Sequence, residues 1–291
     1  MTNRKKLVVI TGVGMRKAVR EFQNTDAEDH VDYHGELFKL NAAAGSAIEL
    51  SKAGHTVFML GVNETYLMHL HKSLIEGPSR YAVINLLDRK ATDNLAEVLT
   101  ELAQQHTADI HIVHYGGVSE VNIELPNNTV FLDPWMTPPE AVPDIVASNT
   151  TTLLNLLQAL RGTLRSQFRT KVVIITAVAA KRTARFHGLD AIQKAACHAM
   201  ARSLALDLTR ENIFVTEIMP GMTDTGFYDS ESTFTAMSQA GREYGYEWTE
   251  ETFPLFSSRK VGQAVRFALD TEAHVRELSL IPYGQFPHLG A

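Results

Sequence analysis

The segment VVITGVG (8–14) places Gly12 and Gly14 directly after a short apolar run. A dinucleotide site needs glycines at such a turn, where the backbone approaches a pyrophosphate beside the first amides of a helix. The third glycine of a G-x-G-x-x-G pattern would stand at position 17, which is Lys17 in this chain. The sequence therefore predicts a phosphate-binding turn in which one glycine is replaced.

Asp190, Lys194 and His187 are a second group that could do chemistry, in the stretch HGLDAIQK (187–194). Free amides and the helix dipole favour aspartate at a helix start, so Asp190 is expected at the N-cap or in the first turn. Burial in an apolar pocket would raise the pKa of this carboxyl group and let it act as an acid. The two interpretations are compatible. His187 is expected as a polar loop residue before the helix.

His30, Asp32 and His34 alternate in a charged segment, flanked by Asp29 and Glu36. Side chains of these types can bind zinc. A charged, solvated loop has the same composition, and the H-x-x-x-H spacing of a helical zinc site is absent from it. We therefore expect a solvated segment and no metal ion.

Composition limits the class of protein. The chain has 291 residues, of which 45% are hydrophobic, and this is enough to bury a core. Its formal charge is −6, and it lacks the basic stripe that binds nucleic acid. No run approaches the ~20 apolar residues of a membrane span, and the N-terminal apolar run is too short for a signal peptide. The single cysteine, Cys197, fits a reducing compartment, so we expect a cytoplasmic protein.

Short apolar runs alternate with longer helical stretches. The runs show no polar/apolar alternation, which indicates strands covered on both faces of a parallel sheet. The expected strands are 7–11, 56–60, 82–85, 110–114, 172–176, 214–219 and 278–282, and the expected helices are 41–53, 93–104, 139–164 and 189–209. This order predicts a doubly wound α/β sandwich, and no linker or repeat divides residues 1–291, so we expect one domain.

Two stretches interrupt this rhythm. Residues 15–39 are highly charged, and we call them the insertion. Residues 226–258 are rich in Ser, Thr, Glu, Gly and aromatic residues, and we call them the substrate loop. Each follows the carboxyl end of a strand, the edge where open α/β sheets bind ligands. The large side chains expected to shape a substrate pocket are Phe227, Tyr228, Tyr244, Tyr246 and Trp248.

Four segments in order resemble the short-chain dehydrogenase/reductase family across nearly the whole chain. They are VVITGVG (8–14), Asn149 in VASNTTTLLNLLQAL (146–160), LALDL (204–208) after the helical Lys194, and IMPGMTDT (218–225). The resemblance implies a Rossmann-type three-layer α/β/α sandwich, a nicotinamide cofactor, and hydride transfer to or from a carbonyl or alcohol. It also implies a mechanism that uses a serine, a tyrosine, a lysine and an asparagine.

The family's catalytic residues carry over only in part. Lys194 and Asn149 match the lysine and the asparagine. The serine position is Ala177, directly after Thr176, and the tyrosine, four residues before the lysine, falls at Asp190. The enoyl-reductase branch places its tyrosine seven residues before the lysine, so the resemblance makes His187 an alternative proton donor.

The resemblance also implies a cofactor site. Thr11 and Gly12 match its Thr-Gly turn, while the last two glycines fall at Asn41 and Ala43, so the insertion interrupts the phosphate loop. We expect it to fold over the cofactor or the pocket mouth, and loss of cofactor binding is the competing interpretation. The other positions expected to contact the cofactor are Gly14, Asn85, Leu86, Tyr115, Gly116, Lys194, Pro220, Gly221 and Thr225, with Gly117 beside them. For Tyr115, packing in the core is the alternative.

The end of the second strand bears on the choice of cofactor. NAD-specific sites place an acid there to bind the ribose, but this chain has Gly61 and Asn63. A 2′-phosphate would not be repelled, and Arg16 and Lys17 could neutralise it. This favours NADP over NAD.

Two hypotheses follow. The first is an NADP(H)-dependent oxidoreductase for a carbonyl, enoyl or alcohol group of a small metabolite, with atypical acid–base residues. The second is a non-redox member of the fold, either a lyase or isomerase that uses Asp190 or a catalytically silent binding subunit. The family also implies a homodimer or homotetramer formed through the two long helices. The contact face would hold Ala195, Ala196, Ala199 and Leu206, whose alternative is packing on the sheet.

Overall fold

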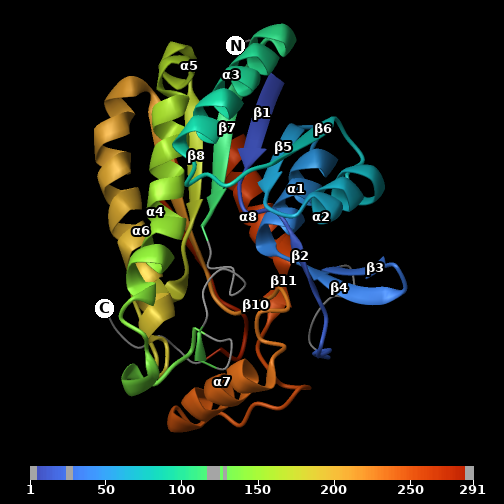
Figure 1. Ribbon diagram of the computed structural model, residues 1–291, viewed down its shortest axis with the longest axis vertical. Coiled ribbons are helices and arrows are strands. Elements are labelled where there is room, and N and C mark those ends of the chain that lie inside the picture. Colours follow the sequence, from blue (N-terminus) through green and yellow to red (C-terminus); the bar gives the residue numbers. More distant parts are fainter. Residues whose placement is uncertain (1–4, 24–28, 117–124, 127–129, 286–291) are drawn as a thin grey trace.

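A seven-stranded sheet forms the centre of the computed structural model, which describes residues 5–23, 29–116, 125–126 and 130–285 (Figure 1). The strands are parallel, in the order β12-β9-β8-β7-β1-β5-β6. Their bounds are β1 Lys5–Ile10, β5 Thr56–Gly61, β6 Ser79–Val83, β7 Ala108–Tyr115, β8 Thr170–Ile175, β9 Ile213–Pro220 and β12 Glu277–Leu280. The doubly wound fold is thereby confirmed. The strand order reverses between β1 and β7, and such a switch point is where these folds bind ligands.

Helices cover both faces of the sheet (Figure 1). On one face lie α3 (Arg89–His106), α4 (Ala141–Ala159) and α6 (Gly188–Asp207), and on the other α1 (Ala42–Lys52) and α8 (Ser258–Asp270). Val8 packs in the α1/α8 layer and Val9 in the opposite layer, and both are fully buried. Burial on both faces explains why the strand sequences do not alternate.

Two further helices in the described part of the chain are short. They are α2 (Glu64–His69), which continues into a π-type turn (Leu70–Leu74), and α5 (Arg161–Ser166). The long helix expected over 139–164 is divided between α4 and α5 at Leu160. Within the described ranges, three further single turns are of 3-10 type, Pro134–Met136, Val178–Ala180 and Leu208–Glu211.

The insertion is an antiparallel sheet rather than the solvated segment expected from its charge. Its strands, in the order β2-β4-β3, are β2 (Met15–Lys17), β3 (His30–Tyr33) and β4 (Glu36–Leu40). The β3–β4 turn uses His34 and Gly35, both at positive φ (56° and 79°). Phe38 and Lys39 are both buried on adjacent positions of β4, so charged side chains point inward as well as apolar ones.

The substrate loop contains regular structure as well. Helix α7 (Glu231–Glu243) begins after Ser230, whose hydroxyl accepts a hydrogen bond from Thr233 N (3.3 Å). The strands β10 (Thr223–Asp224) and β11 (Phe256–Ser257) pair in parallel at the two ends of the loop. A separate apolar core joins the loop to the insertion and to the segment before α4. It includes Phe22, Phe131, Leu132, Ile145, Met237, Trp248 and Phe253.

Candidate active site

The phosphate-binding turn has the expected backbone geometry at Gly12. Its φ is +69°, and a Cβ at this position would lie 2.6 Å from the carbonyl oxygen of Tyr115. Only glycine fits such a close approach without strain. Thr11 ties the turn to β7, because its hydroxyl oxygen accepts a hydrogen bond from Tyr115 N (3.0 Å) and also lies 3.0 Å from Nδ1 of His114.

Asn41 closes the turn across the insertion. Its side-chain Nδ2 donates to Gly12 O (2.8 Å), and its backbone N donates to Gly14 O (3.2 Å). Its Oδ1 caps α1 by accepting from Ala44 N (2.9 Å). Gly14 and Asn41, which we call the neck of the insertion, are therefore adjacent although 27 positions separate them.

The start of α1 keeps the groups that a pyrophosphate requires. The Asn41 cap satisfies the amide of Ala44, and helix geometry leaves the amides of Ala42 and Ala43 without an intrahelical acceptor. Small side chains at these positions leave the backbone accessible to an anion. The residues present thus fit a dinucleotide phosphate, and the contacts of Asn41 and Ala43 with it stay a prediction.

The end of β5 cannot carry an acid. A Cβ at Gly61 would lie 2.4 Å from the carbonyl oxygen of Val13, so the turn excludes any side chain there. Asn63 caps α2 through a hydrogen bond from Tyr66 N to its Oδ1 (3.0 Å). Asn85 is exposed and accepts from Leu87 N, while Leu86 is buried in the core.

The two cations expected near a 2′-phosphate lie on β2. Lys17 pairs with Glu36 of the same small sheet (2.5 Å). Arg16 lies over the ring of Phe227 in the substrate loop, with 5.8 Å between its Cζ and the ring centroid. Their contact with a phosphate stays a prediction.

The insertion spans the ligand-binding edge of the sheet. At one end Tyr33 and Phe38 contact Tyr66 of α2, with ring centroids 5.9 and 5.7 Å apart. At the other end Phe22 stacks on Phe253 of the substrate loop (5.0 Å). The insertion therefore joins the helix beside the expected ribose position to the loop that follows the expected nicotinamide position.

Buried charges stabilise the contact between the insertion and the substrate loop. Lys39 is 0% exposed, and its Nζ lies 2.8 Å from Asp224 Oδ1 and 3.0 Å from Asp229 Oδ1. The other oxygen of Asp229 accepts hydrogen bonds from the backbone amides of Val19 and Arg20 (3.1 and 3.2 Å).

Around this ion pair other polar groups join the insertion to the loop. His30 lies 3.6 Å from Asp224. Arg20 also pairs with Glu231 and Glu250. Among the described residues, no cluster of three or more His, Cys, Asp or Glu is arranged to hold a metal ion.

Lys194 and Asn149 meet beside the switch point. Lys194 Nζ donates to the carbonyl oxygen of Gly116 (3.0 Å) and to Asn149 Oδ1 (3.4 Å). Asn149 is fully buried, and a Cβ at Gly116 would lie 2.6 Å from its Oδ1, so glycine permits this approach. Gly117 lies outside the described residues.

Gln193 extends this pair to Asp190. Its Oε1 accepts from Asn149 Nδ2 (2.8 Å), and its Nε2 donates to Asp190 Oδ1 (3.0 Å). A continuous hydrogen-bonded row therefore runs from Lys194 through Asn149 and Gln193 to Asp190. Lys194 does not pair directly with Asp190. The carboxylate lies in the first turn of α6, one of the two positions expected for it.

The sequence did not single out Gln193, although its helical spacing from Asp190 could have indicated it. It directly precedes Lys194 and stands three positions after Asp190, the spacing at which helical side chains meet. It is buried, so its amide is shielded from solvent.

His187 occupies an apolar environment rather than a polar loop. It is buried, its ring lies 4.7 Å from that of Phe131, and its Nε2 lies 3.1 Å from the sulfur of Met237. Its Nδ1 is buried without a hydrogen-bond partner. Burial lowers the pKa of His187, and the nearby Asp190 opposes this shift.

Tyr228 belongs to the apolar cluster that contains Phe131. Its ring contacts Phe131 and Phe227, with centroids 6.2 and 5.3 Å apart. Burial raises the pKa of the Tyr228 phenol, and the Asp190 carboxylate adds to the increase. Asp190 is therefore close enough to Tyr228 of the substrate loop for its charge to act on the phenol.

The position that the resemblance assigns to a serine offers no hydroxyl. Ala177 is half-buried and precedes a 3-10 turn. The hydroxyl of Thr176 donates to buried Glu217 Oε1 (2.6 Å), which also pairs with His198 Nδ1. Thr176 is thus engaged with Glu217, and its catalytic role stays a prediction.

Tyr115 packs in the core, which is the alternative to cofactor contact stated for it above. Its hydroxyl lies 2.5 Å from Ser46 Oγ on α1, and its side chain contacts the core between the sheet and α1. At the end of β9, Pro220 is buried and Gly221 is close to Gln285, where a Cβ would lie 2.2 Å from its Oε1. Thr225 follows β10 and is half-buried.

Comparison with known proteins agrees with this fold. The profile of the family described as enoyl-(acyl carrier protein) reductase matches residues 41–247, beginning where the insertion ends. An uncharacterized oxidoreductase of Staphylococcus epidermidis is 23% identical over 237 residues, covering 81% of this chain and 90% of the relative.

Solved structures share the fold at low identity. An alcohol dehydrogenase of the archaeon Thermococcus sibiricus, complexed with 5-hydroxy-NADP, superposes with a TM-score of 0.68 at 16% identity over 97% of this chain and 99% of its own. A short-chain dehydrogenase of Streptomyces avermitilis has a TM-score of 0.66 at 17% identity, over 96% and 89%. A metagenomic short-chain oxidoreductase in complex with NADP has a TM-score of 0.63 at 15% identity, over 96% and 98%.

In the described part of the chain, none of the helices has the length and apolar character needed to cross a membrane.

Proposed function

Because the chain belongs to the short-chain dehydrogenase/reductase family, we propose that it is an NADP(H)-dependent oxidoreductase acting on a carbonyl, enoyl or alcohol group of a small metabolite. The observation that carries the proposal is the row Lys194–Asn149–Gln193–Asp190 beside a phosphate-binding turn closed by Asn41. A bound nicotinamide would supply or accept the hydride.

The residues of this chain would position that cofactor. Gly12 and the amides at the start of α1 would receive the pyrophosphate, and Lys194 would reach the ribose from its place beside Gly116. Preference for NADP is supported by the side-chain-free Gly61, which places no acid near a 2′-phosphate. It is also supported by the NADP and 5-hydroxy-NADP bound in two structural neighbours.

Asp190 is the proposed acid–base group. A hydrogen bond from Gln193 holds its Oδ1, and we assign the proton transfer to its Oδ2. In reduction a protonated Oδ2 would give its proton to the new alkoxide, and in oxidation the carboxylate would take the proton from the alcohol. His187, whose Nδ1 is buried without a partner, is the alternative donor.

A non-redox activity is the second candidate. The site has Ala177 and Asp190 in place of the family's serine and tyrosine, and a carboxylate suits a lyase or isomerase base. A catalytically silent binding subunit belongs to the same hypothesis.

Cofactor titration tests the first proposal. Purified protein is titrated with NADPH, NADP⁺ and NADH by calorimetry, and we expect NADPH to bind more tightly than NADH. No binding at millimolar cofactor would overturn the proposal. Transfer of deuterium from 4-deuterated NADPH into the product then separates redox from non-redox activity, since an isomerase or lyase would leave the label on the cofactor.

Variants test Asp190. Asp190→Asn and Asp190→Ala are assayed against a panel of carbonyl substrates, with Asp207→Asn at the exposed other end of α6 as the matched control. We expect turnover to fall at least tenfold in both and to remain in the control. Equal turnover in all variants would remove Asp190 from the mechanism, and a loss confined to His187→Gln would assign the proton to the imidazole.

The proposed homodimer or homotetramer uses the outer surface of α6. Ala195 and Ala199 are exposed there, and Leu206 is 68% exposed, so these side chains are not packed on the sheet. Partly exposed Ala196 lies beside them. Leu206→Asp should shift the protein towards the monomer in sedimentation, and an unchanged mass would place the interface elsewhere. The cytoplasmic address stays a prediction.

A further inference from the structure

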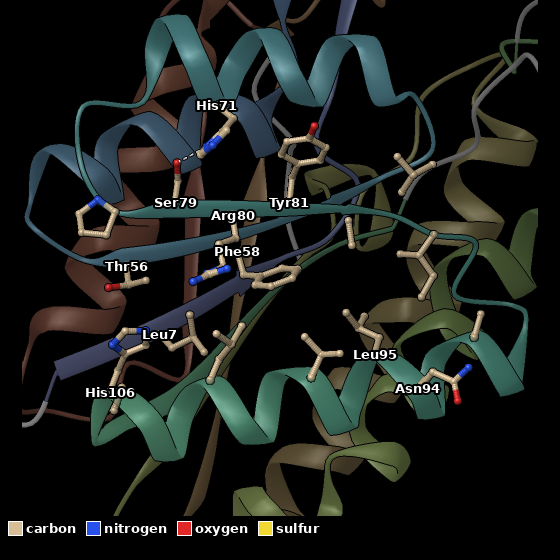
Figure 2. Close-up of a pocket in the computed structure, with 18 residues that line it drawn as sticks. Leu7, Thr56, Phe58, His71, Ser79, Arg80, Tyr81, Asn94, Leu95 and His106 are labelled. Carbon is tan, nitrogen blue, oxygen red and sulfur yellow. Dashed lines mark hydrogen bonds between the residues drawn. The ribbon is translucent and has the colours of Figure 1, made fainter.

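A groove of about 950 Å³ lies between strand β6 and helix α3 (Figure 2). The amino ends of β1, β5 and β7, at Leu7, Thr56 and Ala108, line one end of it. Strand β6 borders it along its length, and α3 forms the opposite wall. None of its lining residues belongs to the phosphate turn, to the row ending at Asp190 or to the substrate loop.

The floor of the groove is apolar. Leu7 and Phe58 on the sheet and Leu95 on α3 have their side chains there, and all three are at most 6% exposed. Ala82 and Ile84 continue this surface towards the carboxyl end of β6. On the rim, Val98 of α3 is 47% exposed, more than a core position would be.

Positive charge lies at the same end of the groove as the amino ends of these strands, because Arg80 is opposite Phe58 in the register of the sheet. Figure 2 shows Arg80 pointing from β6 towards α3, between Phe58 and the end of the helix at His106. Arg80 has no ion-pair partner among the described residues. His71 donates to or accepts from Ser79 Oγ nearby (2.6 Å).

Among the residues that the structure describes, no acid lines the groove, although the chain carries 33 Asp and Glu residues and a formal charge of −6. An acid-free lining on an acidic protein, with one unpaired guanidinium at an end, complements a single anionic group. The apolar floor complements a hydrocarbon chain, and the volume is within the usual range of small-molecule sites.

We propose that this groove binds an amphipathic monocarboxylate, with its carboxylate at Arg80 and its apolar chain along Phe58, Leu95 and Ile84. From Arg80 to Ile84 the strand rises roughly 13 Å, at about 3.3 Å per residue. Decanoate has an extended chain of comparable length and is the probe. A second copy of this chain is the alternative occupant.

Binding is measured by calorimetry with decanoate and with decanol, on protein saturated with NADPH. Three variants are compared. Arg80→Ala removes the charge, Val98→Asp places an acid on the exposed rim, and Arg210→Ala removes an exposed arginine outside the groove. We expect decanoate to bind the wild type and Arg210→Ala equally, and Arg80→Ala at least about fivefold more weakly. Val98→Asp should also bind it more weakly, and Arg80→Ala should leave decanol affinity unchanged.

Other results would overturn the proposal. No decanoate binding at millimolar concentration, or equal affinity in all variants, would remove the groove as its site. Decanol affinity equal to that of decanoate would remove the role of Arg80. Ligand-free dimers that Val98→Asp dissociates in sedimentation would show that a second copy covers the groove instead.

Discussion

Replacing Lys39 by methionine tests how firmly the insertion is held to the substrate loop. The Lys39 side chain is 0% exposed, between two carboxylates that are themselves at most 2% exposed. Removing one partner of a buried ion pair leaves an uncompensated charge and costs about 3–5 kcal/mol. We expect Lys39→Met to lower the free energy of unfolding by about that amount, since methionine keeps the apolar length of the side chain.

The structure assigns most of this cost to one carboxylate. Asp229 would keep the amides of Val19 and Arg20. Asp224 would keep only His30, at 3.6 Å. The double variant Lys39→Met/Asp224→Asn should therefore recover at least about 1 kcal/mol, because it neutralises the charge with the fewest donors.

Urea unfolding followed by circular dichroism and tryptophan fluorescence measures both variants, with coincident transitions as the test of two-state behaviour. Lys52→Met, at the exposed end of α1, is the matched control and should change stability by no more than about 0.5 kcal/mol. A cost below about 1 kcal/mol for Lys39→Met, or a double variant no more stable than the single one, would refute the reasoning.

Three further outcomes are expected. Burial lowers the pKa of His111 to about 3 and of His114 to about 4, so the native protein keeps both neutral while the unfolded chain takes up protons below its usual pKa. Lowering the pH from 7 to 5 should therefore remove about 2 kcal/mol of stability per histidine, and a flat urea midpoint from pH 7 to 5 would contradict this. Gly116→Ala should reduce turnover at least about tenfold by displacing the asparagine whose Oδ1 would lie 2.6 Å from the new Cβ, whereas Gly162→Ala, with no atom within 4 Å of its Cβ, should be silent in the same assay. Asn41→Ala should destabilise the protein by about 1–2 kcal/mol through loss of the helix cap, and should weaken NADPH binding in calorimetry.

Sequence reasoning located the sheet because its signal is local. Neighbours such as Val8 and Val9 are apolar since both faces of the strand are covered, and this pattern needs no knowledge of the rest of the chain. The same reasoning is wrong for the insertion, because its many charged residues predict a solvated segment and the structure has a small sheet there. Lys39 can be buried because it pairs with Asp229. This partner lies 190 positions away in the sequence, so no local pattern predicts the pair.

The site shows the same division. The positions of Lys194, Asn149 and Asp190 follow from segment order, whereas the link between them does not. That link depends on Gln193, a residue type with no special chemistry of its own, and on the close approach allowed by Gly116. A helical-spacing argument would have placed Gln193 beside Asp190, but only the three-dimensional packing of α4 on α6 brings it to Asn149.

The neck of the insertion makes this segment an exchangeable module. Gly14 and Asn41 already share a backbone hydrogen bond of 3.2 Å, so a chain of any length between them begins and ends at one place. Loop-closure entropy grows only slowly with length, and the geometry at Gly12 and α1 is set by Asn41 rather than by what lies in between. A relative could therefore carry a shorter or longer cover at this position, with a different substrate pocket beneath it, and keep the same cofactor turn.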